Sequence, residues 1–214
     1  MKSTFAAIAL SGALLAGNAG AQVLVDGSAD AGKTKSVTCA ACHGADGNSV
    51  NPLWPSIAGQ HASYIVAQLG HFKSGARVNA LMSSQAINLT EEDMRDLAAY
   101  YSAQTPAVKT VSDASLVPKG QSVYRAGNAD SGVSACIACH GPTGAGNPAS
   151  QYPLLHGQYA VYTAKTLRDY KSGARDTGRL SRMMQEIAGR MTEDEIDAVA
   201  SYIQGLRGSV AASD

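Results

Sequence analysis

Two short segments of the chain each combine two thiols with an imidazole. Residues 39–43 read Cys-Ala-Ala-Cys-His and residues 136–140 read Cys-Ile-Ala-Cys-His, and these motifs use all four cysteines. A Cys-x-x-Cys pair alone is shared by zinc sites, thiol–disulfide enzymes and haem attachment, whereas a His directly after it is typical of c-type haem attachment. Two thiols one turn apart can each bond a vinyl group of one porphyrin, and the adjacent imidazole then binds its iron.

The sequence therefore predicts two covalently attached c-type haems. The predicted attachment residues are Cys39, Cys42, Cys136 and Cys139, and the predicted proximal iron ligands are His43 and His140. The alternative is a zinc site or a redox disulfide at each Cys pair. We favour haem because the adjoining His occurs in both copies.

The occupant of the sixth iron position decides between an electron carrier and a catalyst. The remaining histidines, His61, His71 and His156, have no histidine at the equivalent position of the other copy. A methionine does recur. Met82 and Met184 each lie eight residues before a Thr that begins the last helix of its copy. They are the predicted sixth ligands, on segments expected to be irregular (residues 78–89 and 177–191).

Two alternatives to these methionine ligands remain open. Methionine commonly fills irregular apolar gaps, so Met82 and Met184 could be core residues. In the second copy Met183 is the chief rival. If protein ligands fill both axial positions, the site passes single electrons, and the soft thioether favours Fe(II).

The two motifs belong to a longer internal repeat. Residues 73–77 and 171–175 both read Lys-Ser-Gly-Ala-Arg, and a Pro loop that ends in Gly-Gln recurs at residues 54–60 and 152–158. A period near one hundred residues is too long for a solenoid and indicates two tandem domains. We predict a first domain at residues 22–105, a linker at 106–116 and a second domain at 117–214.

The first 21 residues have the features of an export signal. Lys2 precedes an apolar stretch, and Ala-Gly-Ala at residues 19–21 suits a signal peptidase. This predicts a periplasmic protein with the signal peptide removed near Ala21. Without Lys2 the chain has 16 basic and 17 acidic residues, a balance that gives no sign of nucleic-acid binding.

The hydrophobic pattern predicts an all-α fold. Helices are expected at residues 29–37, 61–73, 119–125 and 159–171, and a last helix in each copy begins after Thr90 and Thr192. Thr-x-x-Glu at residues 192–195 is a capping box, and Thr-x-x-Asp at residues 90–93 is a weaker version. Gly32 and Gly120 are expected to let the first helix of each copy cross the last one closely.

Other repeated residues suggest supports for the haems. The carbonyls of Pro55 and Pro153 could accept a hydrogen bond from the proximal histidines and set their orientation. The basic residues of the repeated segment could pair with haem propionates or lie in solvent, and a Tyr on the preceding helix could join them or pack in the core. These residues are Lys73, Arg77, Lys171, Arg175, Tyr64 and Tyr162.

The ordered set of motifs resembles the class I cytochrome c domain, and its tandem form resembles the dihaem cytochrome c4 family over essentially the whole mature chain. The segments that carry this resemblance include both Lys-Ser-Gly-Ala-Arg segments, both Gly-Gln turns and residues 201–206. The resemblance implies a periplasmic electron carrier rather than an enzyme. It implies His/Met ligation of both irons, transfer from a quinol-oxidising complex towards a terminal oxidase, and loose membrane association in some members.

A dihaem enzyme, such as a peroxidase or a thiosulfate-oxidising cytochrome, is the main rival to this function. An enzyme of that kind needs an open iron position or an unusual ligand such as Cys. No cysteine is left over, and one methionine is available for each iron. The sequence therefore favours the carrier.

Overall fold

The protein is described by a computed structural model that covers residues 25–208. This part of the chain holds ten α-helices, one 3-10 turn, two isolated β-bridges and no strand. The predicted all-α fold is confirmed, whereas the predicted signal peptide lies outside the described residues. The elements are α1 (Ala29–Lys35), α2 (Val37–His43), α3 (Ala62–Ser74), α4 (Ala80–Ala86), α5 (Glu91–Ser102), η1 (Ala114–Leu116), α6 (Val117–Ala126), α7 (Ile137–His140), α8 (Ala160–Lys171), α9 (Arg179–Gly189) and α10 (Glu193–Gly205).

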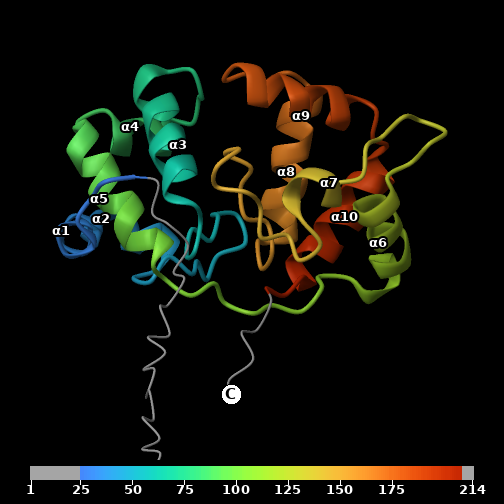
Figure 1. Ribbon diagram of the computed structural model, residues 1–214, viewed down its shortest axis with the longest axis horizontal. Helices are drawn as coiled ribbons and strands as arrows, with labels where there is room; N and C mark the ends of the chain where they lie inside the picture. The colour runs from blue at the N-terminus through green and yellow to red at the C-terminus, as the bar shows by residue number, and fades with distance from the viewer. Residues whose placement is uncertain (1–24, 209–214) are drawn as a thin grey trace, which may run out of the picture.

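The helices form two halves that lie side by side, α1–α5 and α6–α10 (Figure 1). Each half has its own apolar core: Leu97 and Tyr101 belong to the first, and Ile196 and Val199 to the second. Two separate cores mean two domains. The domain boundaries given above stay predictions. We call the surface where the halves meet, between α3 on one side and α8 on the other, the seam.

Glycine lets the first and last helices of each half approach closely. A Cβ on Gly32 of α1 would overlap the Asp96 carbonyl of α5, and a Cβ on Gly120 of α6 would overlap the Ala198 carbonyl of α10. The predicted close crossing is therefore present in both halves.

Capping boxes begin both terminal helices. The Thr90 hydroxyl accepts a hydrogen bond from the Asp93 N–H (3.1 Å), while the Asp93 carboxylate accepts one from the Thr90 N–H (2.9 Å). Thr192 and Glu195 repeat the arrangement in α10. Both predicted caps are confirmed, the Asp version included, because each satisfies two N–H groups that the helix leaves free.

The segments that carry the candidate methionines are helical, which corrects the prediction of irregular chain. Met82 lies on α4 and Met184 on α9. The Asn79 side chain caps α4 by accepting from the Met82 N–H (3.0 Å), and Gly178 precedes α9. The first helix also differs from its prediction, because it ends at Lys35 and α2 carries the first Cys motif.

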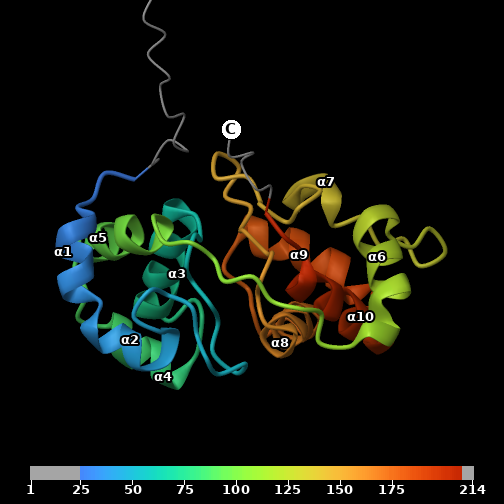
Figure 2. The ribbon, with the colours of Figure 1, turned by 90° about the horizontal axis from the view of Figure 1, so that it is seen from below.

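An extended segment after α5 connects the two halves along the lower edge of the view in Figure 1, and in Figure 2 it crosses the face turned to the viewer. It is fixed on both sides. The Ala107 N–H donates to the Asn48 side chain of the first half (2.8 Å), and Gln204 of the second half donates to the Thr110 carbonyl (2.8 Å). Within residues 25–208, no helix is long and apolar enough to cross a membrane.

Candidate functional site

Short helices present both Cys-x-x-Cys-His motifs. Cys39 and Cys42 lie within α2, while Cys136 is the N-cap of α7 and Cys139 lies inside it. All four thiols are partly buried and free of disulfides. Burial raises the pKa of Cys39, and it raises that of Cys136 to about 11. Thiol–disulfide enzymes need a thiol of lowered pKa, so these two sites lack their electrostatics.

Both motif histidines are buried and oriented in the same way. The Nδ1 atom of His43 lies 2.8 Å from the Pro55 carbonyl oxygen, and that of His140 lies 3.0 Å from the Pro153 carbonyl oxygen. Because a carbonyl only accepts, each Nδ1 carries the proton and each Nε2 keeps a lone pair for a metal. Burial also lowers the pKa of both imidazoles, which favours the neutral form that binds metals. The predicted Pro-carbonyl bonds are present.

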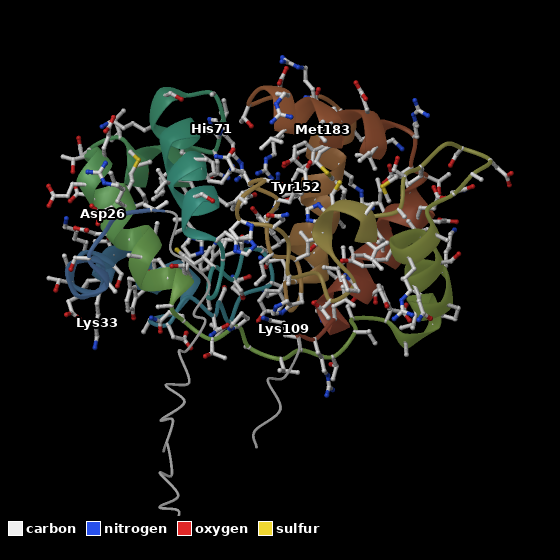
Figure 3. All side chains as sticks on the ribbon, in the orientation of Figure 1. Asp26, Lys33, His71, Lys109, Tyr152 and Met183 are labelled. Carbon is white, nitrogen blue, oxygen red and sulfur yellow. The ribbon has the colours of Figure 1, made fainter. Side chains whose placement is uncertain are left out.

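The two candidate methionines occupy equivalent places on their helices. Ala86 of α4 and Ala188 of α9 are both fully buried, at 0% exposure. Met82 and Met184 each precede this alanine by four residues, so each lies on the inward face of its helix. Met183 does not share that position, and the Arg179 guanidinium lies 4.0 Å from its sulfur (Figure 3). The register favours Met184 over Met183.

The three remaining histidines are engaged elsewhere. His61 Nε2 lies 2.8 Å from the Ala145 carbonyl oxygen across the seam. His71 lies on α3 (Figure 3), where burial and the charges of Arg175 and Arg77 lower its pKa. The ring of His156 lies beside Gly208.

Two guanidinium groups converge in the seam. Arg77 donates to the hydroxyl of Tyr162 (3.0 Å), and Arg175 donates to that of Tyr64 (2.8 Å), so each arginine reaches the other domain. Both also donate to the same Gln68 side-chain oxygen, at 2.8 Å. Arg175 is 3% exposed, which rules out the solvated alternative for it, and its buried Nε has no partner among the described residues.

The lysines of the repeated segment bind backbone instead. Lys73 donates a hydrogen bond to the Leu89 carbonyl, and Lys171 donates one to the Met191 carbonyl; both bonds are 2.5 Å long. Each lysine thereby connects the C-terminal end of its helix, α3 or α8, to the residues just before the last helix of its half, α5 or α10. No carboxylate of residues 25–208 forms an ion pair with Arg77 or Arg175.

These residues fit a haem in each domain. Each half offers two thiols, a buried imidazole whose Nε2 is available, and a thioether on an inward helix face. A buried guanidinium with an unpartnered Nε suits the carboxylates that a haem carries.

Comparison with known proteins agrees with this arrangement. The sequence model of the family Cytochrome c matches residues 29–103 and again residues 117–207. Cytochrome c4 of Pseudomonas aeruginosa is 41% identical over 180 residues, which cover 84% of this chain and 89% of the relative. The crystal structure of reduced recombinant cytochrome c4 from Pseudomonas stutzeri is 38% identical, with a TM-score of 0.82 over 85% of this chain and 100% of that one.

This chain belongs to the cytochrome c4 family. It is an electron-transport protein with two cytochrome c domains, and its cofactors are two c-type haems. Another relative, from Thiomonas intermedia, is named thiosulfate dehydrogenase electron acceptor. It is 36% identical over 173 residues, which cover 79% of this chain and 78% of the relative.

Sequence reasoning assigned no role to Gln60 and Gln158, whose side chains bind the opposite domain in the structure of this cytochrome c4 homologue. The available signal was their recurrence after the Pro loop in both copies. Repetition marks a residue as important to the module, but it does not say whether the partner lies within the domain or across the seam.

Proposed function

We propose that the chain is a periplasmic dihaem carrier that passes single electrons through a respiratory chain towards a terminal oxidase. The proposed domains are residues 22–105 and 117–214, joined by the linker 106–116, after removal of a signal peptide near Ala21. A quinol-oxidising complex is the proposed donor, and loose association with the membrane would keep the carrier near it.

The proposed haem residues follow the two copies of the module. The first set is Cys39, Cys42, His43 and Met82, and the second is Cys136, Cys139, His140 and Met184. The observation that carries the carrier function is the matched pair of inward methionines, each one turn before a fully buried alanine. If a histidine and a methionine both held each iron, no open position would be left for oxygen or peroxide.

In this mechanism the protein keeps the haem-binding side chains in fixed positions, and no atoms are transferred. When bound, the cofactor would supply an iron that can gain or lose one electron. The Pro55 and Pro153 carbonyls fix the imidazoles through Nδ1–H, so their orientation is set before any electron arrives. The short helices α2 and α7 fix the thiols and the histidine on one rigid element. Such preorganisation keeps the rearrangement on electron transfer small.

Visible and near-infrared spectra of the purified protein test this function. We expect two low-spin haems per chain, a methionine–iron charge-transfer band in the ferric form, and no reaction with peroxide. A high-spin ferric haem in the native protein, or rapid peroxide turnover, would contradict the carrier and favour a peroxidase-type enzyme.

A second candidate function keeps the single-electron transfer but has a different electron donor. The Thiomonas intermedia relative is named an electron acceptor of thiosulfate dehydrogenase, which suggests a donor that oxidises thiosulfate. We expect thiosulfate alone to leave the ferric protein oxidised. Reduction upon addition of a thiosulfate dehydrogenase, faster than by a quinol-oxidising complex, would favour this candidate. Turnover of thiosulfate by the chain itself would instead make it an enzyme.

A further inference from the structure

Two glutamine side chains clamp the Pro loops of opposite domains across the seam. Gln158 accepts a hydrogen bond from the Ser56 N–H (3.0 Å) and donates one to the Ser56 carbonyl (2.8 Å). Gln60 accepts from the Leu154 N–H (3.0 Å) and donates to the Leu154 carbonyl (3.0 Å). Both ends of each side-chain amide are used, so the oxygen and nitrogen positions are fixed by their partners.

These bonds reach the peptide units that hold the motif histidines. The Pro55 carbonyl, which accepts from His43 Nδ1–H, belongs to the same amide group as the Ser56 N–H, which donates to Gln158. One amide therefore connects an imidazole of the first domain to a side chain of the second. The order of groups is imidazole N–H, Pro55 carbonyl, Ser56 N–H and Gln158 side-chain oxygen.

The second domain repeats the connection in the opposite direction. His140 Nδ1–H donates to the Pro153 carbonyl, and the N–H of the same amide, that of Leu154, donates to Gln60. Gln60 is 7% exposed and both histidines are 7% exposed, so this connection lies largely out of water. Hydrogen bonds in such surroundings are stronger and polarise one another along a chain.

The physical consequence concerns the electron density of the imidazole. An acceptor on the N–H of an amide makes its carbonyl oxygen a better acceptor. A better acceptor at Nδ1–H makes the imidazole a more basic metal ligand. A more basic ligand stabilises ferric over ferrous iron and so lowers the reduction potential.

We propose that Gln158 and Gln60 are crossed positioning residues, each of which tunes the histidine iron ligand of the other domain. Gln158, in the second domain, acts on His43, and Gln60, in the first domain, acts on His140. This inference rests on the proposed function, because it requires the two histidines to bind iron. It gives the seam a role in setting both potentials.

The variants Gln158→Ala and Gln60→Ala, compared as full-length holoprotein, test the crossed assignment. We expect Gln158→Ala to raise the potential of the His43 haem and Gln60→Ala that of the His140 haem. The expected change in each reduction equilibrium is roughly three- to tenfold, or about 30–60 mV at 59 mV per tenfold. The haem of the mutated domain should change less. NMR resonances of the Nδ1–H protons should shift in the same crossed pattern.

Two further variants separate tuning from simple loss of docking. Gln158→Glu keeps an acceptor for the Ser56 N–H, so it should return the potential of the His43 haem to the wild-type value or below. Ser63→Ala removes a different seam bond, from the Ser63 hydroxyl to the Pro148 carbonyl at 3.4 Å. It should leave both potentials unchanged.

Three outcomes would overturn the inference: shifts confined to the haem of the mutated domain, equal shifts of both haems, or no shift. Failure of the proposed function has a different signature. In that case the wild-type protein itself would lack iron-shifted resonances from the rings of His43 and His140, whatever the glutamine variants do.

Discussion

At the scale of single residues, the sixth ligand depends on a one-residue difference in α9. Met183 and Met184 are neighbours, yet successive residues of a helix point about 100° apart. Met184 precedes the fully buried Ala188 by one turn, whereas the sulfur of Met183 lies near Arg179. The side-chain direction, not the residue type, therefore distinguishes them.

Met184→Ala and Met183→Ala form a matched pair for this assignment. We expect Met184→Ala to make the His140 haem high-spin and to lower its potential by about 60 mV or more, a tenfold shift, because the thioether favours Fe(II). Met183→Ala should leave spectrum and potential unchanged. Redox titration with optical detection measures both. The opposite pattern would make Met183 the ligand.

Repetition made some of these residues predictable and left others without a role. The Pro55 and Pro153 carbonyls could be assigned because a proline follows each motif histidine at nearly the same distance, 12 residues in the first copy and 13 in the second, and a buried imidazole N–H needs an acceptor. The same recurrence could not reveal the partners of Arg77 and Arg175. A tyrosine of the other domain becomes their acceptor only when the domains dock.

At the scale of elements, the crossings of α1 with α5 and of α6 with α10 depend on glycine. A side chain at Gly32 would meet the backbone carbonyl of Asp96, which cannot move without displacing α5. The sequence predicted this crossing because Gly recurs in the first helix of both copies. It did not predict α4, which is only seven residues long, or α9, although apolar residues recur at helical spacing at positions 180, 183, 184 and 187.

Gly32→Ala and Gly70→Ala test the crossing. Both glycines lie in helices, but a Cβ on Gly70 would meet no atom within 4 Å. We expect Gly32→Ala to lower the free energy of unfolding by about 1–3 kcal/mol through overpacking. Gly70→Ala should raise it by about 0.5–1 kcal/mol because Gly is a poor helix former. Urea denaturation of both variants gives the comparison, and equal effects would contradict a close crossing.

The same pair of helices carries a pH-dependent contact. Asp96 of α5 accepts from Lys35 (2.6 Å) and from the Ser28 N–H at the start of α1 (2.7 Å). The hydrogen bond from Lys35, followed by that from Ser28, lowers the pKa of the Asp96 carboxyl. A lowered folded-state pKa stabilises the fold above the usual carboxyl range, and this contribution is lost as the pH falls.

Asp96→Asn should therefore lower the Tm of the first domain at pH 7. The difference from wild type should shrink as the pH falls below the ordinary carboxyl range, and it should disappear once the folded-state carboxylate is protonated. The variant keeps an acceptor for Ser28, so the change isolates the charge. Glu91→Gln removes an exposed carboxylate 3.8 Å from Arg95 and should have little effect at any pH. A pH-independent loss in Asp96→Asn would contradict the charge argument.

At the scale of the whole molecule, the two domains meet through paired, reciprocal contacts. Arg77 binds Tyr162 and the equivalent Arg175 binds Tyr64, while the two glutamine clamps follow the same exchange. Such an arrangement is the single-chain counterpart of a twofold symmetric dimer interface. The repeat in the sequence predicted two domains. It did not predict how they dock, because the repeat shows which residues of the two copies are equivalent and not which residues of one copy contact the other.

Reciprocal contacts imply that damage on one side of the seam destabilises the other side. Tyr162→Phe removes the acceptor of Arg77 and leaves a partly buried guanidinium N–H without its partner, at a cost of about 1–3 kcal/mol. Trp54, the single tryptophan of the chain, lies in the first domain. We expect its fluorescence to rise when that domain unfolds, because its distance from the quenching haem then increases. We expect Tyr162→Phe, a change in the second domain, to lower the unfolding midpoint that Trp54 reports.

Tyr124→Phe is the matched control, because the Tyr124 hydroxyl donates to the Gly141 carbonyl within the second domain (2.6 Å). It should lower the stability of the second domain, as hydrogen exchange of α10 would show, and leave the Trp54 midpoint unchanged. A cross-domain effect limited to Tyr162→Phe means that the arginine–tyrosine bonds couple the domains. If both variants lowered the Trp54 midpoint equally, the coupling would run through the general stability of the second domain rather than through these bonds.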